Sequence, residues 1–229
     1  MSYNVDDVKS WPVFKPLIIA HDVGRTRDRS TAVVGGNSPC GRPVLGIREA
    51  EELPQNLYGY QRANALAAID ARHGSNALIV ADLSNDATNA EVLYETFGPR
   101  VIGVQITRHG DGNECQWWPV KHGYVPVYNI GRTYLLDLFH NELHNRQVRF
   151  ADGQQMRRAY DQLASLEPEY RESGLVYICP PGQHDDLGIS CAMLAWAAKH
   201  PHLETWSANW RAAVQPRKPR QKVNCAGWT

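Results

Sequence analysis

The chain has 229 residues, of which 43% are hydrophobic and 21% are charged, and its formal net charge is zero. This length suffices for one substantial core and is short for two, so we expect a single α/β domain. A zero net charge provides no overall positive field of the kind that attracts nucleic acid, although local basic patches can still bind it.

The 5 cysteines are widely spaced and include no C-x-x-C pair, which indicates neither a disulfide framework nor a zinc site. No apolar stretch approaches the roughly 18 residues that span a bilayer. The first residues lack the charged and apolar regions of a signal peptide. We therefore expect a cytoplasmic protein of a reducing compartment, with no membrane partner.

The apolar run from Leu17 to Gly24 carries one carboxylate, Asp22. β-favouring residues bounded by Pro16 and Gly24 predict a buried strand. An acid at the end of such a strand either caps the following turn or belongs to a site that neutralises its charge. The residues around Asp22 leave both interpretations open.

The elements that follow alternate between strands and helices. Two short β-favouring segments, 30–36 and 44–47, predict an antiparallel meander with the first strand. A helix over 56–73 would return the chain to the starting edge, so the strand at 77–81 should lie parallel to the first. Apolar spacing further predicts strands at 101–106 and 175–179 and helices at 85–97, 130–145, 154–166 and from Leu187, the last with Leu187, Cys191, Leu194, Ala195 and Ala198 on one face.

Residues 107–129 are rich in Gly, Asp and Asn and predict a long loop. Either Trp117 and Trp118 anchor this loop on the core, or the loop faces a substrate with Lys121 and His122 exposed. Three parts of the chain are expected: a lead-in outside the core at 1–15, one domain at 16–205, and a basic, mobile tail at 206–229.

Carboxylates end two further core elements. Asp82 closes the strand after the crossover helix, and Asp185 and Asp186 precede the last helix. The right-handed crossover rule puts Asp22 and Asp82 at the same end of adjacent strands. Converging carboxylates repel one another unless cations lie between them, which suits two Mg²⁺ or Mn²⁺ ions acting on a phosphodiester. Helix capping is the alternative for the Asp185–Asp186 pair, although two acids exceed what a cap requires.

The order of these motifs resembles the nuclease domain of phage terminase large subunits. The matching segments are 18–24 with Asp28 and Thr31-Ala32 beyond, 79–82, and 184–187 followed by 192–195. The resemblance spans roughly residues 16 to 200. It implies an RNase H/RuvC-like α/β fold, with a mixed sheet of five or more strands, an antiparallel meander followed by parallel strands, and helices on both faces.

The resemblance also implies an activity: metal-dependent cleavage of double-stranded DNA, with little sequence specificity, during phage or prophage genome packaging in a bacterial host. The implied catalytic, metal-binding acids are Asp22, Asp82 and one of Asp185 and Asp186, holding two Mg²⁺ or Mn²⁺ ions. We favour Asp186 as the inner ligand and Asp185 in support. Asp28 is a weaker candidate for a metal-binding acid, and the simpler interpretation is that it is a turn residue.

The chain departs from this family in containing no phosphate loop, so we expect no ATP site. It is expected to be an excised domain, a separately encoded nuclease or a prophage remnant, with an ATPase motor, a portal or a small terminase subunit as partner. Arg25, Arg27, Arg29 and Lys121 are candidates to hold DNA phosphates, against the alternative of a solvated surface. A RuvC-like junction or repair nuclease and a packaging or assembly module with a degenerate site remain alternatives.

Overall fold

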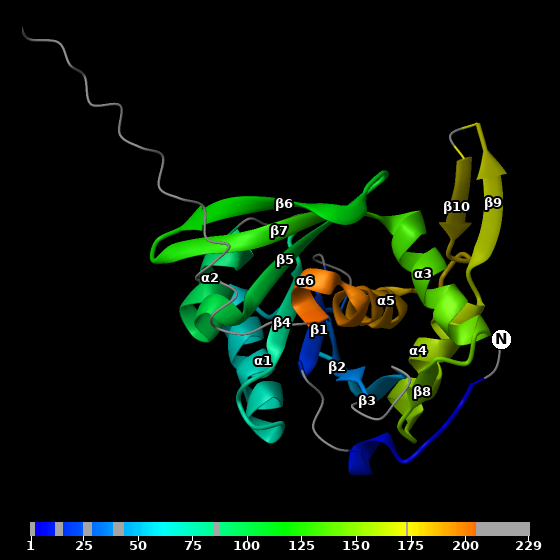
Figure 1. The fold of residues 1–229 in the computed structure, drawn as a ribbon, viewed down its shortest axis with the longest axis horizontal. Coiled ribbons are helices and arrows are strands. Elements are labelled where there is room, and N and C mark those ends of the chain that lie inside the picture. The colour runs from blue at the N-terminus through cyan, green and yellow to red at the C-terminus, as the bar shows by residue number, and fades with distance from the viewer. Residues whose placement is uncertain are drawn as a thin grey trace, which may run out of the picture.

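The computed structural model describes residues 3–11, 16–24, 29–38, 44–84, 88–172 and 174–204. They form an 8-stranded mixed sheet with helices on both faces, and a separate 2-stranded sheet (Figure 1). The strand order in the large sheet is β6-β7-β5-β4-β1-β2-β3-β8. The predicted architecture, a mixed sheet between helices, is therefore confirmed.

The first half of the sheet is the predicted meander followed by a crossover. Strands β1, β2 and β3 pair antiparallel in that order, and β4 returns beside β1 and parallel to it. The helix of this crossover ends at a turn in which Gly74 has a φ of +94°, a conformation that favours glycine. The elements are β1 (Ile18–Asp22), β2 (Thr31–Asn37), β3 (Leu45–Glu52), α1 (Gly59–Arg72) and β4 (Leu78–Asp82).

The prediction of a loop over 107–129 is wrong, because the structure has a β-hairpin there. Its strands β6 (Asp111–Val120) and β7 (Gly123–Gly131) pair antiparallel, and β7 extends the sheet parallel to β5 (Val101–Thr107). Strand β6 lies at the sheet edge and is largely exposed, so it needs few apolar residues and tolerates Pro119. Helix α2 (Thr88–Phe97) and the short η2 (Gly98–Arg100) precede this part.

The second half of the chain adds helices to one face of the sheet. Two strands here were not predicted: β8 pairs parallel with β3, and β9 pairs with the predicted strand β10 in a hairpin outside the main sheet. The elements are α3 (Arg132–His144), β8 (Val148–Phe150), α4 (Gln154–Ala164), β9 (Glu167–Arg171), β10 (Gly174–Ile178), α5 (Asp186–Lys199) and α6 (Pro201–Glu204).

The sheet separates two hydrophobic cores. Helices α1 and α2 pack on one face, while α3, α4 and α5 pack on the other. Helix α5 crosses the middle of its face (Figure 1), and every residue from Leu187 to Ala198 is buried. The expectation of one apolar stripe on α5 is wrong, because the helix is enclosed by the sheet, α3 and α4 together.

The sequence predicts that the N-terminal segment lies outside the core, and this prediction is wrong for Val8. This residue lies in the short 3-10 helix η1 (Val8–Ser10), is fully buried and joins the core beneath α1. Val5 forms a β-bridge with Phe150. The predicted tail at 206–229 lies outside the described residues.

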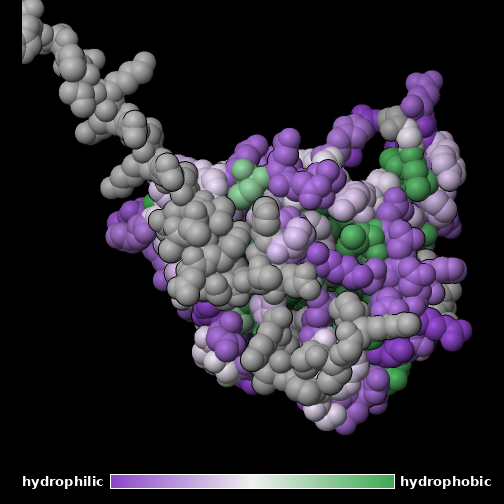
Figure 2. Space-filling view, viewed as in Figure 1, coloured by the Kyte–Doolittle hydropathy of each residue, from purple (hydrophilic) through white to green (hydrophobic). Residues whose placement is uncertain are grey.

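Among the coloured atoms of Figure 2 most are hydrophilic, and the apolar areas include one on the β9–β10 hairpin. Among the residues that the structure describes, no helix is long and apolar enough to span a membrane.

Candidate active site

Asp22 and Asp82 end two adjacent parallel strands. The parallel ladder pairs Ile18 with Leu78 and continues to His21 with Ala81, so the two aspartates follow at the next position of each strand. Ile18 and Ala20 face the core beneath α5, and Asp22, two residues on, faces the same side. The two strand-end acids therefore lie side by side on the α5 face.

The same cross-strand row continues through Thr31, quoted above only as part of a matching segment, and Glu52, which the sequence did not single out. Asp22 pairs with Thr31 on β2, and Thr31 pairs with Glu52 on β3. Directly paired residues point to the same face of a sheet. The row therefore reads Asp82, Asp22, Thr31 and Glu52 across four strands, with its side chains toward α5.

The first turns of α5 are bonded to this row. The Asp22 N–H donates to the Ser190 hydroxyl at 3.2 Å, and the Ser190 and Thr31 hydroxyl oxygens lie 2.7 Å apart. The Thr31 hydroxyl in turn donates to the carbonyl oxygen of Asp186 at 3.1 Å. This chain of hydrogen bonds holds the helix turn that carries Asp186 over the strand ends.

Asp82 is buried and oriented by Ser84. One carboxylate oxygen, Oδ1, accepts a hydrogen bond from the Ser84 N–H at 2.8 Å and another from the Ser84 hydroxyl. The hydroxyl oxygen also accepts from the N–H of Ile106 on β5, at 2.6 Å. These bonds fix the carboxylate at the strand end.

Asp185 and Asp186 are directed to different surroundings. The Asp185 carboxylate is ion-paired with Arg132 on α3, whose second terminal nitrogen donates to the Tyr177 carbonyl at 2.7 Å. Within the described part of the chain, the Asp185 side chain makes no capping hydrogen bond to α5. Asp186 instead lines a cavity of about 180 Å³, whose other lining residues are Arg29, Glu52, Gln55, Arg158 and His184.

The basic candidates are separated by the fold. Arg29 precedes β2 and lines the cavity beside Asp186, whereas Arg25 and Arg27 lie outside the described residues, as does Asp28. Lys121 sits in the β6–β7 turn, where its N–H donates to Glu91 on α2. That turn lies at the amino ends of the parallel strands, so Lys121 is at the opposite edge of the sheet from the aspartates.

His21 faces the other side of the sheet. Its Nδ1 lies 2.8 Å from the carbonyl oxygen of Thr31 in a fully buried position. Burial is the main reason that the pKa of His21 falls to about 4, and the neighbouring Arg62 lowers it further. This histidine is neutral at physiological pH and has a structural role next to Asp22.

The donor set suits a divalent metal ion, because carboxylate oxygens are the ligands that Mg²⁺ and Mn²⁺ prefer. Two strand-end carboxylates lie side by side, and a third is carried by the helix above them. Within the described ranges, however, no group of three His, Cys, Asp or Glu side chains is already placed to hold an ion. The three carboxylates and their position at one edge of the sheet therefore suit a metal ion. Their side chains are not yet close enough together to coordinate one.

The sequence pattern gave no role to Thr31, which it quoted only within a matching segment, and it missed Ser84, Ser190, Glu52 and Arg158. Ser190 gives a detectable signal, since it is a polar residue one helical turn after Asp186 in an otherwise apolar helix. The positions of Glu52 and Arg158 depend on strand register and helix packing, which no local pattern encodes.

Comparisons with known proteins find similarity in the structure. No protein-family model and no curated protein sequence matches the chain. The large terminase nuclease of the thermophilic phage G20c is 18% identical, with a TM-score of 0.52 over 80% of this chain and 81% of that one.

The nuclease domain of the large terminase g2p from bacteriophage SPP1, solved with bound Mn, is 12% identical, with a TM-score of 0.51 over 84% of this chain and 90% of that one. At such identities the likeness concerns the fold. The chain therefore has the RNase H-like fold of the nuclease domains of phage large terminases.

Proposed function

We propose that the protein is a metal-dependent endonuclease of the terminase type, which hydrolyses phosphodiester bonds of double-stranded DNA with little sequence specificity. The observation that carries this proposal is the placement of Asp22 and Asp82 on adjacent strand ends, beneath the helix turn that bears Asp186. The terminase nuclease fold supports the same activity.

In this proposal Asp22, Asp82 and Asp186 hold the metal. Two bound Mg²⁺ or Mn²⁺ ions would stabilise the attacking and leaving oxygens of the phosphodiester. Ser84 orients the Asp82 carboxylate, and the Ser190 and Thr31 hydroxyls hold α5 against the strand ends. Asp185 has a supporting role, because its charge is already paired with Arg132.

DNA would reach this site in the setting that the fold suggests, which is genome packaging. A separate ATPase motor, a portal or a small terminase subunit would then present the duplex to the exposed edge of the site. Phosphate contacts carry little sequence information, which agrees with cleavage of low specificity.

The decisive test is cleavage of supercoiled plasmid in Mn²⁺ or Mg²⁺, beside EDTA and an Asp22→Asn variant. We expect metal-dependent nicking and linearisation, and a rate at least about 100-fold lower in the variant, because a metal ligand is lost. Asp6→Asn, an exposed residue of the N-terminal segment, is the matched control and should cut normally. A folded wild-type protein that cuts neither plasmid, linear nor branched DNA in either metal would overturn the proposal.

Metal binding can be measured without activity. Millimolar Mn²⁺ should raise the melting temperature of the wild-type protein, by about 2–4 °C for each kcal/mol by which the bound metal stabilises the folded state at this chain length. Asp22→Asn should lose most of that rise, whereas Asp6→Asn should keep it. An equal rise in the wild type and Asp22→Asn would remove Asp22 from the metal site.

A further inference from the structure

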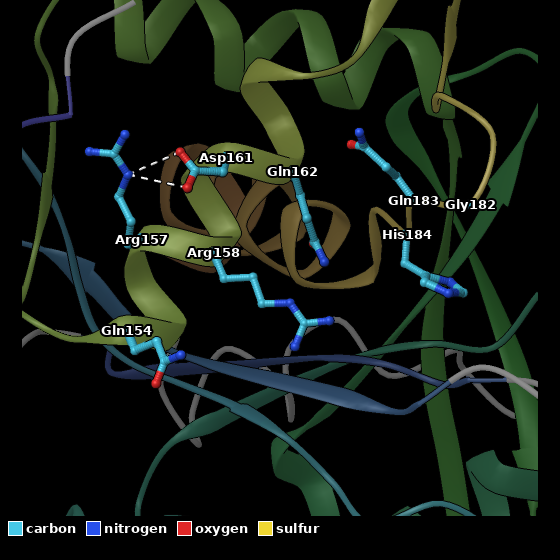
Figure 3. Close-up of a pocket in the computed structure, with 8 residues that line it drawn as sticks. All are labelled: Gln154, Arg157, Arg158, Asp161, Gln162, Gly182, Gln183 and His184. Carbon is cyan, nitrogen blue, oxygen red and sulfur yellow. Dashed lines mark hydrogen bonds and ion pairs between the residues drawn. The ribbon is translucent and has the colours of Figure 1, made fainter.

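Two cavities meet beside Asp186. The smaller, of about 180 Å³, contains Asp186, and the larger, of about 610 Å³, runs along α4 toward the loop that precedes α5. Arg158 and His184 line both of them. Figure 3 shows Arg158 reaching from α4 into the space between this helix and the loop of Gln183 and His184. We call these two adjoining cavities the trough, which extends from the candidate catalytic acid along α4.

The wall of the trough is tied to the helix that carries Asp186. Gln162 of α4 accepts a hydrogen bond from the Gly188 N–H, in the first turn of α5, at 3.1 Å. The position of α4, and with it that of Arg158, is therefore fixed relative to Asp186.

Arg158 is held by a buried carboxylate. Its Nη1 lies 2.7 Å from Oε1 of Glu52, while Nη1 of Arg29 lies 3.1 Å from Oε2 of the same residue. The Glu52 side chain is 7% exposed, whereas those of Arg158 and Arg29 are 50% and 54% exposed. One buried acid thus fixes two guanidinium groups that both still face solvent, and the trio keeps one net positive charge.

The neighbouring arginine is different. Arg157 is bonded through Nε to both oxygens of Asp161, at 3.0 and 3.2 Å (Figure 3), and this pair has no net charge. Arg157 also lies over the rings of Tyr3 and Tyr160. The net positive charge at the larger cavity therefore comes from the group of Arg158, Arg29 and Glu52, and the Arg158 guanidinium has five N–H donors, of which Glu52 takes few.

We propose that Arg158, together with Arg29, binds a backbone phosphate of the DNA strand near the bond that is cut. Guanidinium groups bind phosphate through paired N–H donors, and a fixed guanidinium loses little entropy when it does so. The trough gives the strand a path along α4 away from Asp186. This inference rests on the proposed nuclease function and assigns it a strand-positioning site.

The test measures binding of a short DNA duplex by fluorescence anisotropy, in EDTA, at several salt concentrations. Arg158→Gln should weaken binding about tenfold and lower the slope of log affinity against log salt by about 0.9, because one phosphate contact is lost. Arg158→Lys keeps the positive charge beside Glu52 but lacks the paired N–H donors of a guanidinium, so it should lose an intermediate amount of DNA affinity. If Arg158→Gln does not fold, Arg158→Lys is the variant that tests the proposal.

Arg72→Gln is the matched control, because Arg72 is likewise an ion-paired arginine, bound to Glu49 and Glu51, but on the opposite face of the sheet. Its affinity and salt slope should equal those of the wild type. Unchanged affinity and slope in a folded Arg158→Gln, or an equal loss in Arg72→Gln, would overturn the proposal.

The two proposals fail in distinguishable ways. A wild-type protein that cuts DNA, with an Arg158→Gln variant that binds and cuts equally well, keeps the nuclease and removes the phosphate site. A wild-type protein that binds DNA without cutting it removes the nuclease, and the Arg158 variants still decide the phosphate site. A protein that does not bind DNA overturns both.

Discussion

Strand β3 presents acids to both faces of the sheet, and the two sets differ in burial and in partners. Glu49 and Glu51 face α1, where Arg72 binds both of them and His73 lies 2.7 Å from Glu49. Glu52 faces α4 and α5, and is bound by Arg29 and Arg158 from two other segments.

The first set is a cluster at the end of one helix, with acceptors that are 30% and 44% exposed. The second has a single acceptor that is 7% exposed and lies in the row of strand-end acids. A buried acceptor fixes its cations more firmly than an exposed one, which is screened by water. In the proposed function, the α1 face supports the fold and the α5 face carries the chemistry.

The largest expected effect is on the α5 face and separates the two adjacent acids. Asp186→Asn should lower the initial rate of plasmid cleavage in Mn²⁺ at least about 100-fold, as the loss of a metal ligand would. Asp185→Asn should lower it about tenfold or less, because Asp185 pairs with Arg132. A larger loss of rate in Asp185→Asn than in Asp186→Asn would exchange their roles.

The next effect is on stability and concerns His21. In the folded protein the pKa of His21 is about 4, so the side chain stays neutral down to about that pH. In the unfolded chain His21 has the ordinary pKa of 6.5. The unfolded state therefore binds more protons between these values, and the free energy of unfolding falls by up to about 3 kcal/mol as pH drops from 6.5 to 4.

Urea denaturation at pH 7, 6, 5 and 4 measures this loss. His21→Gln should show a flatter dependence on pH than the wild type over that window. Parallel curves for the two proteins would mean that the buried histidine does not control acid stability.

A smaller effect is expected for Glu49 on the α1 face. Its hydrogen bond to His73, followed by the interactions with Arg72, lowers the pKa of Glu49 from 4.5 to about 2. The stabilisation is complete above pH 4.5 and is lost as pH falls toward 2. Because the side chain is partly exposed, we expect it to amount to no more than about 1 kcal/mol.

Glu49→Gln should remove this part of the acid dependence in a thermal melt and leave the rate of DNA cleavage within about twofold of the wild type. A large loss of cleavage in folded Glu49→Gln would break the distinction between the two faces.

Local sequence patterns correctly predicted the strands that end at Asp22 and Asp82, the crossover helix between them and the helix that follows Asp186. Apolar runs, helical spacing and the right-handed crossover act over short distances along the chain, so they can be read without a structure. The same patterns failed at 107–129, where an exposed edge strand needs no apolar alternation.

Tertiary structure alone decided which polar residues meet. Strand register brings Glu52 into line with Thr31 and Asp22, and the packing of α4 places Arg158 against Glu52. The ion pair with Arg132 on α3 directs Asp185 away from Asp186, and the direction of β7 puts Lys121 at the far edge of the sheet. Pairing across strands and packing between helices join residues far apart in the chain, so the sequence by itself determined the candidate acids, and only the folded protein determined their surroundings.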